Sequence, residues 1–280
     1  MVQSQRAASV FRAVLLFTAV VFCACLPQTK IPIDTILYNS GATQGSRMLF
    51  VYLPGRGDDM TAFQDNGLID AVRERGLDVD IIAVNAHMGY YLNGTAFTRI
   101  REDVLAPAKA KGYNKIWLIG NSLGGYGSLS YARQYPDDIE GVVLLGPFLG
   151  SRELIDEISR AGLLNWRPVE IKKNTEDEWD KQLWLWLKDR VEQKTFGTGG
   201  RDCGSGKKSC SPKIYLGYGR GDRFSHGQDF LASFMPSDHV LVIDGGHRWG
   251  TWKKIWAMFL DKKIFSEMTR TAPITPEKRQ

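Results

Sequence analysis

Cysteine and histidine are scarce in this sequence, with four residues of each type among 280. Two of the cysteines fall within the first 26 residues, and only Cys203 and Cys210 follow. Neither has a histidine or a second cysteine pair at metal-ligand spacing, so we expect no metal site. So few cysteines also exclude a fold held by a disulfide framework, and a chain that is 43% hydrophobic can bury a core without one.

The sequence also lacks a strong excess of one charge. Its 36 Lys and Arg stand against 31 Asp and Glu, for a net charge of +5, and no basic stripe of the kind that binds nucleic acid is present. A phosphate-binding loop is excluded because Gly206-Lys207-Lys208 lacks the Ser or Thr that follows the lysine in such loops. We therefore expect no nucleic-acid partner and no cofactor, and the oligomeric state stays open.

The longest apolar run is short. It extends from Ala13 to Leu26, whereas an ordinary spanning helix needs about 20 residues. Two arginines precede it, as in a signal peptide, so we expect residues 1–26 to direct export to the periplasm or the membrane surface. Residues 22–25, Phe-Cys-Ala-Cys, resemble the lipobox of bacterial lipoproteins. Cys25 is thus the candidate for a lipid that attaches the protein to the membrane. The alternatives are simple cleavage of the leader, an uncleaved anchor and a mispredicted start of the chain.

Cys203 and Cys210 lie in a polar, glycine-rich stretch, which can bring both thiols together. Disulfides form in oxidising compartments, to which the leader would send the chain. We therefore predict a Cys203–Cys210 disulfide, with two free thiols as the alternative.

Short apolar runs alternate with amphipathic segments of helix length along most of the chain. The runs are rich in Val, Ile and Leu, which is typical of strands buried on both faces. The expected strands are 48–53, 79–84, 115–119, 141–145, 213–218 and 240–243, and the expected helices between them are 61–75, 95–111, 123–134 and 250–260. This alternation predicts an α/β fold with a mostly parallel central sheet flanked by helices.

The alternation stops between Phe148 and Lys213. We interpret residues 149–212 as a helical insertion, with its best helix over 176–191, in a domain that spans 47–270. Residues 27–46 are expected to form a linker or edge segment, and 271–280 a flexible tail.

A Gly-x-Ser-x-Gly motif occurs at residues 120–124 and carries the first chemical signal. A predicted strand ends just before it, and a predicted helix begins just after Ser122. A serine on such a sharp strand-to-helix turn exposes its hydroxyl above the sheet. Ser122 is therefore the candidate nucleophile, and a glycine-rich turn without a nucleophile is the alternative.

A serine nucleophile needs a base and a group that orients the base. His247 follows the last predicted strand, at the edge where sites of open α/β sheets lie, and is the candidate base. His226 is the alternative, and His239 is interpreted as structural because it begins a strand. Asp222 follows the preceding strand and is the candidate acid, although an Asp at this place can simply cap a helix. Asp229 and Asp244 are less well placed.

Acyl transfer also needs donors for an oxyanion. The backbone N–H of Leu123, next to the nucleophile, is one candidate. The loop Leu53 to Asp58 follows an early strand, and the N–H of Arg56 is the second candidate. The side chain of Arg56 could instead hold an anionic group of the substrate.

In combination, these residues resemble the α/β-hydrolase superfamily, with the nucleophile at Ser122, the acid at Asp222 and the base at His247 in the order that this arrangement has. The resemblance implies an eight-stranded, mostly parallel sheet and a helical lid inserted after the sixth strand. It also implies a serine hydrolase, and a serine nucleophile argues against a dehalogenase. Pro54 departs from the family, many members of which have His before the glycine of the oxyanion loop.

The insertion gives the only indication of the substrate. Trp184 and Trp186 belong to a tryptophan-rich segment that could cover an acyl chain or a ring, and His87 is expected to line the pocket. The alternative is that these tryptophans pack the insertion onto the core. We expect a small-molecule or lipid ester, cleaved through an acyl-enzyme. Acyl transfer, thioester or amide cleavage, and a catalytically silent ligand-binding module are the alternatives.

Overall fold

The chain forms one seven-stranded sheet in a computed structural model that describes residues 28–41, 48–168, 176–196 and 211–265. The order of the strands is β1-β3-β2-β4-β5-β6-β7. Only β1 is antiparallel to its neighbour, and the other pairs in this sheet are parallel. The strands are β1 (Thr35–Tyr38), β2 (Met48–Leu53), β3 (Asp80–Val84), β4 (Lys115–Asn121), β5 (Gly141–Leu145), β6 (Lys213–Gly221) and β7 (Val240–Gly246). The predicted α/β fold with a mostly parallel sheet is confirmed.

Two details differ from the expectation. The described residues contain seven strands instead of eight, and the insertion follows β5, the fifth of them. Strand β1 lies in the segment expected to be a linker or an edge, and it forms the antiparallel edge of the sheet. Its four residues alternate between exposed and partly buried positions, so its apolar residues 36–38 are not buried on both faces as in most of the predicted strands.

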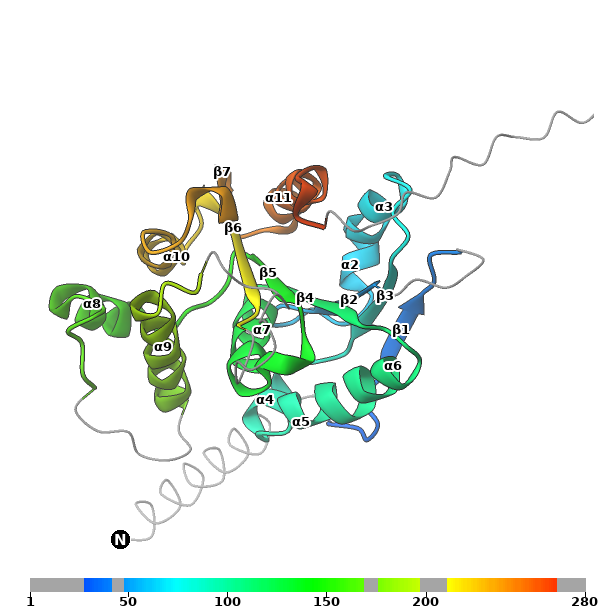
Figure 1. Ribbon diagram of the computed structural model, residues 1–280, viewed down its shortest axis with the longest axis horizontal. Helices are drawn as coiled ribbons and strands as arrows, with labels where there is room; N and C mark the ends of the chain where they lie inside the picture. The colour runs from blue at the N-terminus through cyan, green and yellow to red at the C-terminus, as the bar shows by residue number, and fades with distance from the viewer. Residues whose placement is uncertain (1–27, 42–47, 169–175, 197–210, 266–280) are drawn as a thin grey trace, which may run out of the picture.

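Helices cover both faces of the sheet (Figure 1). Alternate residues of β2 point to opposite faces, so that Leu49 and Val51 enter one core cluster while Phe50 and Tyr52 enter the other. The face with Phe50 is covered by α2 (Ala62–Asp65), α3 (Leu68–Arg73) and α11 (Trp249–Asp261). The face with Leu49 is covered by α4 (Met88–Leu92), α5 (Ala96–Arg99), the π-helix η1 (Ile100–Leu105), α6 (Ala106–Ala110) and α7 (Leu123–Gln134).

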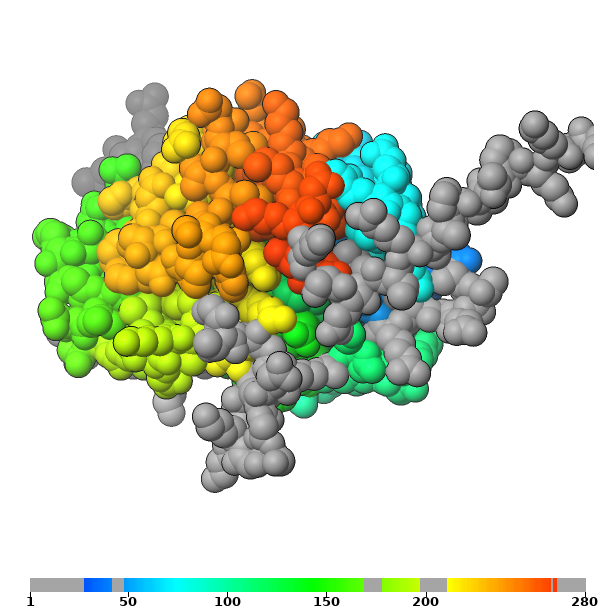
Figure 2. All heavy atoms as spheres, turned by 45° about the horizontal axis from the view of Figure 1, so that its top comes forward, coloured from blue at the N-terminus to red at the C-terminus, as the bar shows by residue number. Residues whose placement is uncertain are grey.

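The insertion between β5 and β6 contains α8 (Arg152–Ala161) and α9 (Glu176–Glu192). Ser151 begins α8 as its N-cap, because its hydroxyl accepts a hydrogen bond from the N–H of Leu154 at 3.2 Å. Helix α8 packs against α10 (Ser225–Ala232), and α9 packs against α7. Figure 2 shows these inserted helices, in green and yellow-green, side by side with α10 in orange. The insertion therefore packs against α10 and against α7, the helix that follows β4.

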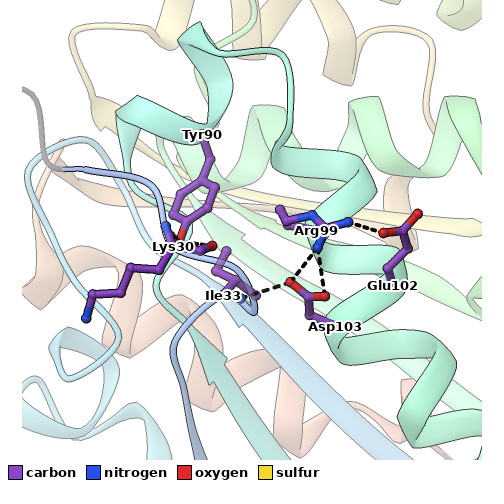
Figure 3. A network of polar contacts seen from close by, with 6 residues as sticks. All are labelled: Lys30, Ile33, Tyr90, Arg99, Glu102 and Asp103. Carbon is purple, nitrogen blue, oxygen red and sulfur yellow. Dashed lines mark hydrogen bonds and ion pairs between the residues drawn. The ribbon is translucent and has the colours of Figure 1, made fainter.

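The segment before β1 is fixed to the helices that follow β3 (Figure 3). The hydroxyl of Tyr90 accepts from the N–H of Lys30 at 2.9 Å and donates to the carbonyl of Lys30 at 3.0 Å. The N–H of Ile33 donates to Asp103 at 2.9 Å, and Arg99 donates to the same carboxylate at 3.0 Å. Arg99 also pairs with Glu102. Residues 30–33 are thus attached to α4 and η1.

None of the helices described is long and apolar enough to cross a membrane. The leader with Cys25, the pair Cys203 and Cys210, and the tail 271–280 lie outside the described residues. The predictions for them stay predictions.

Candidate active site

Ser122 stands at the turn between β4 and α7, with φ 51° and ψ −115°. A non-glycine residue rarely adopts a positive φ, and such strain persists only where the surroundings impose it. Here the main chain is held on both sides. The N–H of Ser122 donates to the carbonyl of Leu145 at 3.1 Å, and its carbonyl accepts from Phe148 at 3.1 Å and from Tyr126 at 3.2 Å. The turn therefore points the serine side chain out of both β4 and α7.

The two glycines of the motif are required by close contacts of the backbone. A Cβ on Gly120 would lie 2.1 Å from the carbonyl oxygen of Gly124. A Cβ on Gly124 would lie 1.9 Å from the carbonyl oxygen of Leu53, at the end of β2. Neither position has room for a side chain, so the motif reflects the packing of β2, β4 and α7 against one another.

His247 and Asp222 come together with Ser122 at the carboxyl ends of the parallel strands. Nε2 of His247 lies 2.9 Å from Oγ of Ser122, and Nδ1 lies 2.9 Å from each carboxylate oxygen of Asp222. Asp222 directly follows β6 and His247 directly follows β7. Their side chains are 0% and 9% exposed, and Ser122 is 7% exposed as a residue. The three predicted residues thus form one hydrogen-bonded line.

Further contacts orient the acid and the base. Oδ1 of Asp222 also accepts from the N–H of Phe224 at 2.8 Å. The imidazole of His247 contacts two aromatic rings, Phe224 and Trp252, each with its centroid 4.9 Å away and nearly perpendicular. The carboxylate at Nδ1 favours the tautomer with the proton on that nitrogen, which leaves Nε2 free to accept from Ser122.

The loop after β2 lies against the nucleophile. A Cβ on Gly55 would lie 3.4 Å from the Cβ of Ser122 and 2.7 Å from Nδ2 of Asn121. The loop is closed by a hydrogen bond of 3.2 Å from the N–H of Asp58 to the carbonyl of Gly55, and Nδ2 of Asn121 lies 3.4 Å from the Asp58 carboxylate. Leu123 begins α7, so its N–H has no partner within that helix. Both predicted oxyanion donors, Leu123 and Arg56, therefore belong to segments that meet at Ser122.

The other histidines have different partners. Nε2 of His226 lies 2.6 Å from Asp156 of α8, so this residue links α10 to the insertion. His239 is buried, stacks on Tyr215 at 4.3 Å and has Nδ1 2.9 Å from the carbonyl of Ile214. His87 is the N-cap of α4 and its Nδ1 accepts from Gly89 at 3.2 Å. It faces the N-terminal segment and is not among the residues that line the neighbouring cavity.

A cavity of about 250 Å³ lies beside the nucleophile, between α4, α7 and the insertion. Leu123 and Phe148 connect it to Ser122, the first by sequence and the second by the hydrogen bond to the serine carbonyl. Its aromatic lining consists of Tyr91, Tyr126, Phe148 and Trp179. Of these four residues, only Trp179 belongs to the tryptophan-rich segment indicated by the sequence, and it was not among the residues predicted to bind substrate. Only the tryptophan content of 166–186 indicated an aromatic contribution from the insertion.

The two tryptophans predicted for the substrate lie elsewhere. Trp184 is 0% exposed, donates from Nε1 to the carbonyl of Leu149 at 2.7 Å, and belongs to the core. The guanidinium of Arg190 lies over the ring of Trp186, 5.2 Å from its centroid. Trp179 precedes both of them on α9, and it is the tryptophan of this helix that lines the cavity. The packing interpretation therefore holds for Trp184.

No group of three or more His, Cys, Asp or Glu in the described part of the chain could hold a metal ion. The line of Ser122, His247 and Asp222 needs none for proton transfer and nucleophilic attack.

Comparisons with known proteins agree with this fold. Residues 86–187 match the family described as serine aminopeptidase, S33. No curated protein matches the sequence. Among solved structures, a fluorophosphonate-binding serine hydrolase of Staphylococcus aureus is similar with a TM-score of 0.56 and 17% identity, over 84% of this chain and 94% of that chain.

Two further similar structures have names that include ferulic acid. A ferulic acid esterase has a TM-score of 0.56 and 13% identity, over 84% of this chain and 94% of that chain. Est1E from Butyrivibrio proteoclasticus, in a structure with ferulic acid bound, has a TM-score of 0.52 and 14% identity, over 83% and 96%. At these identities the similarity shows the fold. The family match covers less than half of this chain, so the chain resembles serine hydrolases of the α/β-hydrolase type. The chain has the α/β-hydrolase fold.

Proposed function

We propose that the protein hydrolyses carboxylic esters through an acyl-enzyme intermediate. The observation that carries this proposal is the hydrogen-bonded line from Ser122 through His247 to Asp222, with the serine on a strained turn. His247 takes the proton of the Ser122 hydroxyl as the oxygen attacks the ester carbonyl, and Asp222 stabilises the imidazolium that forms.

The N–H groups of Leu123 and Arg56 are the proposed donors to the oxyanion of the tetrahedral intermediate. When the intermediate collapses, His247 gives its proton to the leaving alcohol and the acyl group stays on Ser122. Water then attacks the acyl-enzyme with His247 again as the base, which releases the carboxylic acid and restores the serine.

Fluorophosphonate labelling and hydrolysis of p-nitrophenyl esters test this function. We expect Ser122→Ala to abolish both. Ser128→Ala is a suitable control, because Ser128 lies in the same helix α7. Its hydroxyl donates to the carbonyl of Gly124, one helical turn away, at 2.8 Å. Unchanged labelling of the Ser122→Ala protein would contradict the proposal. No labelling of the folded wild-type protein would favour a catalytically silent binding module.

Amide cleavage is a second candidate, because the matching family is described as serine aminopeptidase. The same nucleophile, base and oxyanion donors would serve an amide, with His247 protonating an amine instead of an alcohol. Rates on an ester and an amide with the same acyl group separate the two activities. Acyl transfer and thioester cleavage are distinguished by adding an acceptor alcohol or by using a thioester of the same acid.

We further propose that residues 1–26 direct export and that Cys25 carries a lipid. The Arg-flanked apolar run and the lipobox-like residues 22–25 support this. Mass spectrometry of the protein from the membrane fraction tests it, and an unmodified Cys25 would remove the lipid from the proposal.

A further inference from the structure

The backbone from Gly55 to Asp58 forms a tight turn beside the nucleophile. The N–H of Asp58 donates to the carbonyl of Gly55 at 3.2 Å, and Gly57 has a φ of 88°. A hydrogen bond of this span with a positive φ at the third residue is typical of a type II turn. Arg56, whose N–H is the proposed second oxyanion donor, is the second residue of this turn. The position of that donor therefore depends on how the turn is held.

The tip of the turn is not packed against the described part of the chain. Arg56 is exposed, and a Cβ on Gly57 would have no atom within 4 Å. The start of the turn is packed, because a Cβ on Gly55 would lie 2.7 Å from Nδ2 of Asn121. Whether the tip keeps one orientation therefore depends on the other end of the turn, at Asp58.

That other end is attached to Asn121, the residue just before the nucleophile. Nδ2 of Asn121 donates to the Asp58 carboxylate at 3.4 Å. Asn121 is the last residue of β4 and is 0% exposed, so the sheet and the surrounding core fix the position of its amide. One amide group thus contacts both Gly55 and Asp58, and its backbone leads directly into Ser122.

The oxygen of the same amide indicates why an asparagine occupies this position. Oδ1 of Asn121 is buried and has no hydrogen-bond partner among the described residues. A buried polar atom without a partner costs stability, and an apolar side chain would avoid that cost. The asparagine is therefore better explained by the bond from its nitrogen to Asp58 than by a contribution to folding.

We propose that Asp58 and Asn121 are positioning residues, whose hydrogen bond fixes the turn so that the N–H of Arg56 points at the oxyanion of the reacting ester. An oxyanion donor is effective only within hydrogen-bond distance of the oxygen that becomes charged. Loss of the bond therefore slows the chemical step and leaves the binding of the ester largely unchanged. This inference rests on the proposed ester hydrolysis, and it adds the groups that set the geometry of one oxyanion donor.

Steady-state hydrolysis of p-nitrophenyl acetate tests the pair. Asp58→Ala and Asn121→Ala each remove one partner, and we expect each to lower kcat and kcat/KM together by about tenfold or more. The double variant should be no slower than the slower single variant, because both changes break the same bond. Asp58→Asn keeps a side-chain oxygen that can accept, and we expect its kcat to stay within about threefold of the wild type.

Asp59→Ala is the matched control. Asp59 is the next carboxylate of the same loop, but it accepts from the N–H and the hydroxyl of Thr61, at 2.7 Å and 2.8 Å. We expect this variant to keep the wild-type kcat. Asn121→Ala should melt close to the wild type, because it also removes the oxygen without a partner. Asp58 is only partly buried, so its variants test the proposal even if Asn121→Ala does not fold.

NMR relaxation separates failure of this inference from failure of the proposed function, because it needs no turnover. The ¹⁵N order parameters of the Arg56 and Gly57 amides should be about 0.85 in the wild type and in Asp59→Ala, and below about 0.6 in Asp58→Ala. If they fall in this way and the wild type hydrolyses no ester, the bond holds the turn as inferred and the ester hydrolase is the part that fails. The inference is wrong if hydrolysis occurs and Asp58→Ala keeps the wild-type kcat, or if Asp59→Ala lowers kcat equally.

Discussion

Replacing Ser122 by Gly separates the hydroxyl from the backbone strain at the nucleophile. The φ of 51° and ψ of −115° are sparsely populated for a residue with a Cβ, and glycine adopts them freely. Such a conformation costs about 1–3 kcal/mol. Glycine in turn costs about 0.4–1 kcal/mol through the larger entropy of the unfolded chain. The difference leaves the Gly variant more stable, by about 1 kcal/mol, than a variant with a Cβ at this position.

Ser122→Ala is the reference for this measurement. Both variants lose the hydroxyl and its 2.9 Å contact with His247, so the difference between them reports the Cβ alone. Thermal unfolding followed by circular dichroism should place the Tm of Ser122→Gly about 2–4 °C above that of Ser122→Ala, and both should be inactive. A Gly variant that melts at or below the temperature of the Ala variant would refute the reasoning, because the turn would then store no strain.

Three other changes have defined outcomes. Asp222→Asn should lower kcat by about 10⁴ with the fold intact, because the base loses its oriented tautomer; steady-state kinetics check this. Gly124→Ala should lower the unfolding free energy by about 3 kcal/mol or more in urea, since its Cβ would lie 1.9 Å from a carbonyl oxygen, whereas Gly250→Ala, with nothing within 4 Å, should not. Burial lowers the pKa of His87 in the folded state. As the pH falls below about 6.5, the unfolded state binds a proton at His87 more readily than the folded state does, so the free energy of unfolding decreases. His87→Asn keeps a helix cap and should lose less Tm between pH 7 and pH 5 than the wild type.

The line of Ser122, His247 and Asp222 could be predicted because each residue has a local signal. Each follows a run of strand-like residues, and parallel strands bring their carboxyl ends to one edge of the sheet. Ser122 also lies in a motif whose glycines are required by contacts within three neighbouring elements. Position along the chain was therefore sufficient to expect proximity in space.

The wall of the cavity could not be predicted in the same way. Helix α9 has tryptophans on more than one face, and both the core and the cavity favour aromatic side chains. Trp184 lies in the core and Trp179 lines the cavity. Which of these two places each tryptophan occupies depends on how the insertion packs on α7 and α10. Residues 27–46 were predicted only as a linker or an edge segment, because β1 pairs with β3 at the edge of the sheet and its side chains are not fully buried there.

The hydrogen bonds between Lys30 and Tyr90 limit the distance between the folded domain and a lipid bound to Cys25. Four residues lie between Cys25 and Lys30, which makes five steps along the chain. An extended chain covers at most about 3.6 Å per step, so the two residues are no more than about 18 Å apart. Tyr90 belongs to α4, whose neighbouring residues Met88 and Leu92 line the cavity. A lipid on Cys25 would therefore hold the mouth of the cavity within a few nanometres of the bilayer and restrict its orientation, so that substrates would reach it from the layer of water next to the membrane.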